Sequence, residues 1–480
     1  MTGYTDKIKS DFRIMKEVTK ITKMNPDVRR NKVETFVHRL TGNPEVKAQL
    51  AEWGTEYGNA LCTVEGRLLN PQTIVQKNQK ATYQSANADW MRDIRSRLSD
   101  KEPEAVGNFW MMLHCNDESR AIGFAKTLAQ VAGPLGLPLN PTPGKMLNVG
   151  SDGGAAFVAA ATKNWNAQCR LIVSVFPNNA ADRYSTFKNQ FCCVAPCPTQ
   201  VVLSKTIEPG KNLMSVATKV AIQVVAKLGG QNWKMNFPFN VPTMVVGIDT
   251  HRDRINKEVI VAATGSHNPG FSGYHNFSTA VPQTQNRDDE EDAMFDAARD
   301  LVRKCVEAFK KSNNVWPHQV FIYRDGISEG QVGNIRDKEV AGIVEALKGL
   351  PASPPIKSTY VLVNKRDSSR FSVGTANPLS GTVVDQIVTR SYRFDFYIVS
   401  QSVREGTVAP TYYNVIHHQC NLPPDAMQQM TYMLCHMYFN WAGTIRVPAP
   451  CQYARKHAQL VALNLHGPAA DALREKLFFL

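Results

Sequence analysis

Residues 320–331 read VFIYRDGISEGQ, and this stretch decides how the second half of the chain is interpreted. An apolar run rich in β-forming residues stops abruptly at Arg324, Asp325 and Gly326. Asp-Gly directly after a strand is a common turn signature, so Asp325 can simply turn the chain. A carboxylate held rigidly at the end of a buried strand can also be a metal ligand. Both interpretations stay open on this stretch alone.

A second aspartate follows a second apolar run in the same way. Asp249 closes TMVVGID, residues 243–249. If the two strands are neighbours in one sheet, the carboxylates of Asp249 and Asp325 meet at one site. Phosphodiester hydrolysis by a two-metal mechanism needs such carboxylates, which hold two Mg²⁺ ions roughly 4 Å apart. From spacing alone, the interpretation of these aspartates as turn residues is favoured over their interpretation as metal ligands. The metal site is the more specific hypothesis of the two.

The residues around these two runs predict a mixed sheet flanked by helices. Further strands are expected in EVIVAAT, TYVLV and DFYIVSQSV. Helices are expected in EDAMFDAARDLVRKCVEAFKK, DKEVAGIVEALKGL, PDAMQQMTYMLCHMYFNW and CQYARKHAQLVALNL. The acidic run 288–292 is interpreted as the charged first turn of the first of these helices, which the helix dipole favours.

The preceding part of the chain predicts a separate α/β unit that begins near residue 105 and ends near residue 232. NFWMMLHC, CRLIVSVFP and VVLSKTI look like buried strands, and NLMSVATKVAIQVVAK looks like a long amphipathic helix that Gly229 and Gly230 should end. PFNVPTM is interpreted as the linker into the next unit. Residues 1–104 are rich in charge and helix formers, and we expect a helical or extended linker region with a small core of its own.

Composition bounds the class of protein. A chain of 480 residues is too long for a single hydrophobic core, so two or three domains are expected. Its content of 43% hydrophobic and 20% charged residues is ordinary for a soluble globular protein. No apolar run is long enough to span a bilayer, and the charged first 30 residues argue against a signal or transit peptide. No membrane partner is therefore expected.

The cysteines and the net charge bear on location and partners. The ten cysteines are scattered without zinc-finger spacing, which predicts reduced, mostly buried thiols in a cytoplasmic or nuclear protein. The net charge of +13 favours a polyanionic partner such as nucleic acid. A basic protein without a nucleic-acid role is the alternative.

Several long motifs then point to one family. GIDTHRD, YRDGISEGQ, VSQSVREGTVAPTYYNVI, MTYMLCHMYFNWAGTIRVPAPCQYA and the terminal LREKLFFL together resemble the Piwi branch of the Argonaute family. The resemblance runs through essentially the whole chain. It implies a post-PAZ linker over residues 1–104, a MID domain with a Rossmann-like α/β fold over 105–235, and a PIWI domain with an RNase H-like fold over 236–480. The family's N-terminal and PAZ domains have no counterpart here, so we expect a shortened form of a longer protein.

The resemblance implies a role for the two aspartates. The family's PIWI domain cuts a target strand paired to a guide, and Asp249 and Asp325 match its two metal-binding aspartates, which hold Mg²⁺ or Mn²⁺. Slicing members complete the site with a glutamate and with a histidine or aspartate. The fourth position is Arg455 here, and arginine has no lone pair to give a cation. His457 lies two residues on, about 200° round the helix axis.

The glutamate position also departs from the family pattern. Counted back from Asp325 without gaps, it falls on Ala293, with Glu291 and Asp292 close enough in sequence to substitute. Each lost electrostatic contributor typically costs two or more orders of magnitude in rate. We therefore expect slicing to be weak or absent.

The resemblance also implies a pocket for the 5′-phosphate of a guide strand. Without the resemblance, the residues of this pocket would be interpreted as an ordinary solvated face of the protein. Tyr184 would stack the terminal base, and cationic and amide side chains would hold the phosphate. The matching positions are Tyr184, Lys188, Gln200, Gln223 and Lys227.

Glutamine at position 223 matches the Piwi branch rather than the Argonaute branch, which carries lysine there. The resemblance therefore implies that this glutamine recruits a divalent cation, expected to be Mg²⁺, to the phosphate. The C-terminal carboxylate, here that of Leu480, is a ligand or near neighbour of that cation.

Three functions follow. The first is a small-RNA, piRNA-like guide-binding protein of RNA silencing that pairs its guide with a target RNA or nascent transcript and barely cuts it. The second is an active guided Mg²⁺-dependent endonuclease that uses Asp249 and Asp325 with Glu291 or His457 as a substitute. The third is a scaffold that recruits silencing factors. Arg455 and Ala293 favour the first over the second.

Overall fold

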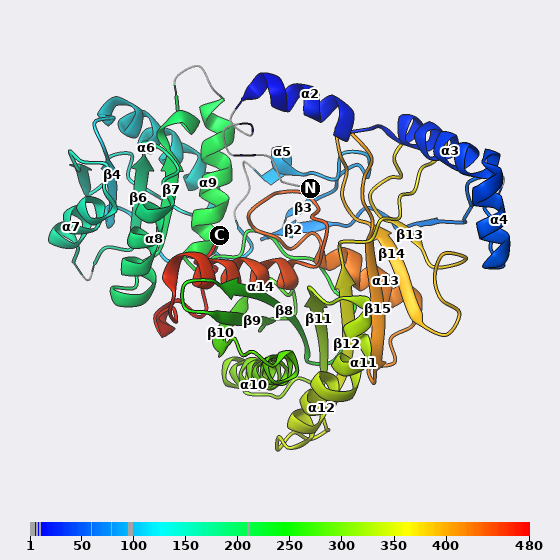
Figure 1. Cartoon of the computed structure of the whole chain (residues 1–480). Coiled ribbons are helices and arrows are strands. Elements are labelled where there is room, and N and C mark those ends of the chain that lie inside the picture. Colours follow the sequence, from blue (N-terminus) through cyan, green and yellow to red (C-terminus); the bar gives the residue numbers. More distant parts are fainter. Residues whose placement is uncertain are drawn as a thin grey trace.

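The computed structural model describes residues 5, 8, 11–58, 60–77, 79–94, 99–166, 168–208 and 212–480. Figure 1 shows a smaller α/β unit beside a large central sheet, with a row of N-terminal helices along one edge of the molecule. None of the helices within the described residues is long and apolar enough to cross a membrane. All ten cysteines lie in this described part, and each is a free thiol, as the sequence predicts.

The smaller unit is a four-stranded parallel sheet with strand order β5-β4-β6-β7. Its central strands are buried along their whole length, which explains their continuous apolar sequence. The strands are β4 (Trp110–His114), β5 (Lys145–Asn148), β6 (Leu171–Phe176) and β7 (Thr199–Leu203). The helices are α6 (Glu118–Ala132), α7 (Gly154–Asn164), α8 (Ala181–Asn189) and α9 (Leu213–Lys227).

Helix α9 ends where the sequence predicts. Its last residue is Lys227, and Gly229 has a φ of +79°, the left-handed conformation that favours glycine after a helix. The helix is buried along most of its length. The position of Lys227 in the last turn brings its side chain to the sheet of the smaller unit, as described below.

The large sheet has nine strands in the order β1-β13-β14-β15-β12-β11-β8-β9-β10. β8, β11 and β12 are parallel at its centre, and the other pairs are antiparallel, so the predicted mixed sheet is confirmed. The strands are β1 (Arg67–Leu68), β8 (Thr243–Asp253), β9 (Glu258–Ser266), β10 (Tyr274–Pro282), β11 (Gln319–Asp325), β12 (Lys357–Asn364), β13 (Thr382–Val384), β14 (Phe394–Val399) and β15 (Thr411–His418). The sequence analysis did not predict β1, β10, β13 or β15.

Helices cover both faces of this sheet. α10 (Arg287–Asn313), α11 (Val332–Asn334) and α12 (Ala341–Lys348) lie on one side, and α13 (Pro424–Leu434) and α14 (Ala449–Leu460) lie on the other. Side chains alternate along the central strands, so Val246 and Ile248 pack in the cluster of α10 and α12, whereas Val245 packs in that of α13 and α14. Asp288, Asp289 and Glu290 of the acidic run lie in the first turn of α10, as predicted, whereas Glu291 and Asp292 come after it.

Helix α13 is shorter than the sequence predicts. It ends at Leu434, and the mostly buried residues 435–442 run on as irregular chain rather than as helix. In this segment the Tyr453 hydroxyl accepts a hydrogen bond from the amide N–H of Phe439 and donates one to the carbonyl of Met437. Tertiary hydrogen bonds thus replace the helical pattern, and they leave Asn440 to face the smaller unit.

The N-terminal segment is organised differently from the prediction. α2 (Phe12–Thr22), α3 (Pro26–Gly42) and α4 (Pro44–Glu52) precede β1, β2 (Ile74–Gln76), β3 (Gln79–Ala81) and α5 (Met91–Ile94). β1 joins the edge of the large sheet. Ile74 and Trp90 belong to the same core cluster as α6 and α9, and the Trp90 and Trp233 rings lie 5.6 Å apart. The expectation of a small core of its own was wrong, because this segment buries its apolar residues against the other units.

Candidate functional site

Asp249 and Asp325 lie side by side on one face of the large sheet. β8 and β11 are parallel neighbours in which Ile248 is paired with Arg324, so the next residues along both strands are the two aspartates. Both side chains are buried, at 6% and 3% exposure. A Cβ built on Gly326 would lie 3.4 Å from Asp249 Oδ1, which shows how closely the chain after β11 approaches β8.

The structure corrects one detail of the prediction. Asp325 is the last residue of β11, but Asp249 lies within β8 rather than after its end. β8 continues to Asp253 because residues 249–253 remain paired with β9 after the parallel partner has stopped. Asp249 is therefore held within a continuous strand, more rigidly than a turn residue would be.

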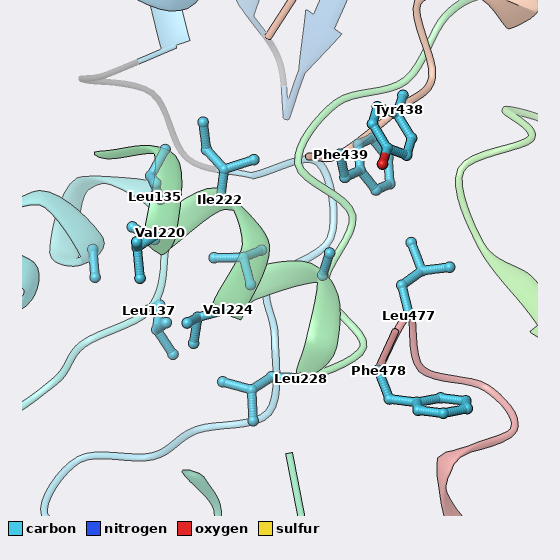
Figure 2. Packing of buried hydrophobic residues seen from close by; sticks show 14 of the residues in the cluster. Leu135, Leu137, Val220, Ile222, Val224, Leu228, Tyr438, Phe439, Leu477 and Phe478 are labelled. Atoms are coloured by element: carbon cyan, nitrogen blue, oxygen red, sulfur yellow. The ribbon is translucent and has the colours of Figure 1, made fainter. Parts of the chain in front are cut away.

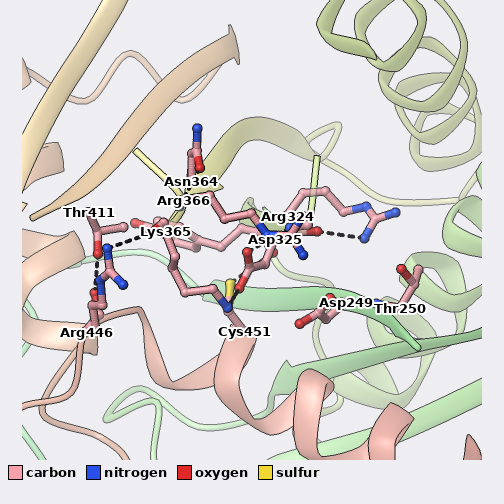
Figure 3. A network of polar contacts seen from close by, with 12 residues as sticks. Asp249, Thr250, Arg324, Asp325, Asn364, Lys365, Arg366, Thr411, Arg446 and Cys451 are labelled. Atoms are coloured by element: carbon pink, nitrogen blue, oxygen red, sulfur yellow. Dashed lines mark hydrogen bonds and ion pairs between the residues drawn. The ribbon is translucent and has the colours of Figure 1, made fainter. Parts of the chain in front are cut away.

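Burial and like charge act on Asp249 and Asp325, and Figure 3 shows the polar side chains around them. Burial, followed by the charge of Asp325, raises the pKa of Asp249 to about 6, against the lowering effect of Lys365, the Thr250 amide and Arg324. The Asp325 carboxylate accepts hydrogen bonds from the ammonium of Lys365 and, at 2.7 Å, from the amide of Gly326. An internal cation just beyond the end of β12 therefore neutralises one of the two carboxylates.

The first turn of α14 closes one side of this site. Gly247 makes the close approach possible, because a Cβ there would lie 2.1 Å from the carbonyl carbon of Pro450. Cys451 is fully buried near the carboxylates, and its thiol donates to the Tyr323 carbonyl at 3.3 Å. Burial, then the charges of Asp325 and Asp249, raises the pKa of Cys451 well above its ordinary value, so the sulfur is a neutral thiol.

Arg455, at the position expected for a fourth ligand, and His457 add no ligand to the two aspartates. Arg455 is on α14, and its charge acts together with burial to lower the pKa of His251. His457 points elsewhere: its ring stacks on Phe479 at 5.3 Å, its Nε2 lies 3.3 Å from Ser278 Oγ, and burial lowers its pKa to about 3. His457 therefore lies against β10 and the C-terminal segment, away from the aspartates.

The acidic substitutes at the start of α10 have other partners. Glu291 accepts hydrogen bonds from Gln331 Nε2 at 2.7 Å and from Asn334 Nδ2 at 3.1 Å. Asp292 accepts one from the ammonium of Lys338 at 2.6 Å. Both carboxylates are thus bound to the helical segment that follows Asp325, and the alanine at position 293 offers no ligand atom.

This donor set does not fit a two-metal site. Over the described ranges, no three histidine, cysteine, aspartate or glutamate side chains come together as a metal site would require. Two carboxylates remain, and Lys365 occupies one of them. Two Mg²⁺ ions need several shared oxygen ligands and cannot share them with an ammonium group.

The second predicted site forms where α8, β7 and α9 meet. Lys188 Nζ and Lys227 Nζ both donate to the carbonyl of Thr199, at 3.3 and 3.0 Å. Lys188 also donates to Thr199 Oγ1 at 2.7 Å, and Lys227 donates to Gln200 Oε1 at 2.8 Å. Both lysine residues are only 2% exposed. The structure therefore brings together three of the residues predicted from sequence.

Negative charge is missing around these two ammonium groups. Neither Lys188 nor Lys227 forms an ion pair with any carboxylate of the described chain. Burial, followed by the charge of Lys188, lowers the pKa of Lys227 well below its ordinary value. Two buried, adjacent cations without a counter-ion form a site that an anion would stabilise.

A chain of amide groups continues from the lysines towards the large sheet. Gln200 Nε2 donates to Gln223 Oε1 at 3.1 Å, and Gln223 Nε2 donates to Asn440 Oδ1 at 2.5 Å. Tyr184 is half-buried, with the Lys188 ammonium 5.7 Å from its ring centroid. Gln223 and Tyr184 thus join the site as predicted, whereas Asn440 was missed because its segment was predicted as helix.

Two further residues extend the site. Lys219 lies one turn before Gln223 on α9, and its ammonium lies 5.3 Å from the ring centroid of Trp441. The spacing 219, 223, 227 places three polar side chains on one face of the helix, so Lys219 could have been found from sequence. Trp441 could not, because it comes from the irregular segment after α13.

The C-terminus reaches the same core as α9. Leu480 is half-buried and packs against the cluster that also receives Tyr184 and Trp441. Figure 2 shows Leu477 and Phe478 of the C-terminal segment beside α9, near Tyr438 and Phe439. The apolar tail is therefore docked into the core between the smaller unit and the large sheet.

Comparison with known proteins agrees with this architecture. The family model described as Piwi domain matches residues 171–466. The chain is 36% identical to Piwi-like protein 1 of Danio rerio over 485 residues, covering 100% of this chain and 55% of that protein. It is 34% identical to Protein piwi of Drosophila melanogaster, covering 100% of this chain and 56% of that protein. The chain thus spans about half the length of the curated relatives it matches.

Solved structures show the same fold. The crystal structure of Drosophila Piwi matches with a TM-score of 0.87 and 33% sequence identity, covering 98% of this chain and 64% of that one. The structure of Kluyveromyces polysporus Argonaute with a guide RNA matches with a TM-score of 0.81 at 17% identity, covering 100% of this chain and 59% of that one. The predicted fold class, a Rossmann-like MID unit followed by an RNase H-like PIWI unit, is confirmed.

Proposed function

Since this chain belongs to the Piwi branch of the Argonaute family, we propose that it binds a small guide RNA for RNA silencing and anchors the guide's 5′-phosphate on Lys188 and Lys227. The observation that carries the proposal is the pair of buried ammonium groups with no carboxylate partner among the described residues. A terminal phosphate would supply the missing negative charge through charge-assisted hydrogen bonds. The guide would then pair with a target RNA or a nascent transcript.

The remaining residues of the site support the same proposal. Tyr184 beside Lys188 offers a ring face for the terminal base, and Gln200 already bridges Lys227 to Gln223. Amide and carboxylate oxygens are ligands that Mg²⁺ prefers, so Gln223 and the Leu480 carboxylate would hold a cation at the phosphate. That cation would add positive charge next to a buried anion. The net charge of +13 favours a polyanionic partner in general.

The test compares oligonucleotides that differ only in the 5′ group. Lys188→Ala or Lys227→Ala is expected to weaken binding of a 5′-phosphorylated guide about tenfold or more, since a hydrogen bond to a charged group contributes roughly 1.5–3 kcal/mol. Binding of the 5′-hydroxyl guide should change little, as measured by fluorescence anisotropy. Lys163→Ala, at an exposed position of α7, is the matched control.

Equal losses for the two oligonucleotides would contradict the proposal, because the lysines would then contact only the backbone in general. Lys227→Met, which keeps the volume of the buried side chain, separates loss of charge from loss of packing. A wild-type chain that showed no preference for the phosphorylated guide would also rule the site out.

We further propose that guided cleavage is weak or absent. Asp249 and Asp325 have the placement of a catalytic pair, but Lys365 neutralises one, and Arg455 and Ala293 stand where further ligands would be needed. A cleavage assay with guide, matched target and Mg²⁺ or Mn²⁺ should yield no product above background. Robust cutting that Asp325→Ala abolishes would favour the slicer alternative instead.

Location and protein partners belong to the same proposal. A guide-binding protein of this kind would act in the cytoplasm or the nucleus. Recruitment of silencing factors is compatible with guide binding and would use other surfaces of the large sheet unit.

A further inference from the structure

A cavity of about 400 Å³ lies between α10, β10 and the C-terminal segment, apart from both sites described above. Leu301 and Ala308 of α10 form one wall, Phe277 of β10 another, and Phe478 of the tail a third. His457 of α14 also lines it. Its volume lies within the range of about 300–1,000 Å³ that small-molecule sites occupy.

The cavity contains a buried polar group without a partner. His457 is 2% exposed, and its Nε2 lies 3.3 Å from Ser278 Oγ, but its Nδ1 has no hydrogen-bond partner in the described protein. Burial holds the imidazole neutral, with a pKa of about 3. The imidazole is thus a neutral, buried part of the cavity wall, and the surrounding atoms cover Nδ1 itself.

Unpaired cations surround the mouth of the cavity. Lys304 and Lys311 of α10 are exposed and form no ion pair within the described ranges. The Arg474 guanidinium lies 4.8 Å from the Phe277 ring centroid and pairs with Asp471. The carboxylate of Glu307, which also lines the cavity, is occupied by Arg303, at 2.9 Å. The mouth therefore carries more unneutralised positive than negative charge.

We propose that this cavity binds a small aromatic anion, with its ring against Phe277 and Phe478 and its acidic group at Lys304 and Lys311. The apolar side chains of Phe277, Leu301 and Phe478 suit a flat ring, while the ammonium groups at the mouth suit a carboxylate or a phosphate. The site does not depend on the proposed guide function, since it uses none of the residues around Lys188 and Lys227.

Fluorine NMR with trifluoromethylbenzoate tests the site on the full chain. Saturable binding is expected for the wild type. The double variant Lys304→Glu, Lys311→Glu should bind about tenfold or more weakly, since it reverses the charge that holds the carboxylate. Ala308→Trp should abolish binding by filling the cavity, and His457→Phe, which keeps a ring in the wall, should leave binding nearly unchanged. Lys348→Glu, at an exposed position of α12, is the control and should bind as the wild type does.

Displacement by adenosine monophosphate identifies the natural class. Displacement of the fluorinated probe in a Lys188→Ala background would mark the ligand as a mononucleotide, and its failure would mark it as an aromatic carboxylic acid. Binding that does not saturate, or that survives both Ala308→Trp and the charge reversal, would overturn the proposal. Thermal unfolding of each variant separates loss of the site from loss of the fold.

Discussion

Like charges are buried next to each other at two places in this molecule. Asp249 lies beside Asp325, and Lys188 lies beside Lys227. In both pairs burial disfavours the charged form and the neighbour adds repulsion. The aspartates have an internal cation in Lys365, whereas the lysines have no internal anion among the described residues. This difference is why an external ligand is proposed for the lysines and not for the aspartates.

The Asp249 carboxylate should destabilise the fold near neutral pH. Its pKa is raised to about 6 from about 3.8, so the protonated form stabilises the native state below pH 4 and this contribution is lost as pH rises through 6. Asp249→Asn removes the charge and keeps an acceptor for the Thr250 amide. In metal-free buffer at pH 7.5 it should raise the free energy of unfolding by up to about 3 kcal/mol, at roughly 1.4 kcal/mol per pKa unit.

Urea unfolding at several pH values measures this effect, and the gain should shrink as pH falls towards 4. Asp253→Asn is the control of opposite sign. Burial pushes the pKa of Asp253 up, but hydrogen bonds from His466 and from the amides of Asn256 and Ile255 outweigh it, so the pKa is lowered. That variant should lose stability at pH 7.5. An Asp249→Asn protein no more stable than wild type would show that the carboxylate is well solvated or compensated.

At the scale of elements, the site geometry depends on how closely α14 approaches β8. Pro450 and Cys451 at the start of the helix lie directly over Gly247, two residues before Asp249. Only a residue without a Cβ permits this contact, because the nearest atoms belong to the backbone of the helix. The helix thereby covers the buried aspartates and places Arg455 one turn further along.

Gly247→Ala should therefore destabilise the protein by about 3 kcal/mol or more, since overpacking against backbone atoms cannot be relieved by a rotamer change. Gly123→Ala in α6 is the matched control. A Cβ there meets nothing within 4 Å, so the same change should stabilise by roughly 0.5–1 kcal/mol. Thermal unfolding of both variants measures the difference. Equal effects in the two would mean that α14 moves away from the sheet at little cost.

At the scale of the whole molecule, the proposed guide site lies between units that are far apart in sequence. Gln223 of α9 contacts Asn440 of the large unit, and the C-terminal segment packs beside both. A cation held by Gln223 and the Leu480 carboxylate would join the phosphate to these two parts of the chain.

Removal of divalent cations should accordingly weaken the binding of phosphorylated guides. EDTA is expected to lower the affinity for the 5′-phosphorylated oligonucleotide and to leave the 5′-hydroxyl oligonucleotide unaffected, as measured by anisotropy at constant ionic strength. Gln223→Lys, which supplies a fixed charge in place of the cation, should make binding insensitive to EDTA. If EDTA did not change the affinity of the wild type for the phosphorylated guide, the pocket would instead work without a cation, like the pockets of the Argonaute branch that carry lysine at this position.

Local sequence patterns determined much of this protein. The continuous apolar runs of β8 and β11, the glycine that follows α9, and the common helix face of Gln223 and Lys227 are all local features of residue type and spacing. The pattern also separated His457 from Arg455 correctly, since residues two apart on a helix face opposite sides. Long, ordered motifs indicated the family.

Only the tertiary structure decided which residues meet across long separations. Lys365 reaches Asp325 from just beyond the end of the neighbouring strand β12, Asn440 reaches Gln223 because α13 ends early, and Trp90 is buried against Trp233 rather than in a core of its own. Such contacts depend on the paths of connecting segments, which no local period encodes. Residue type and spacing therefore specified which side chains are available at each strand end and helix face. Packing between distant segments determined which of these charged side chains have a partner of opposite charge.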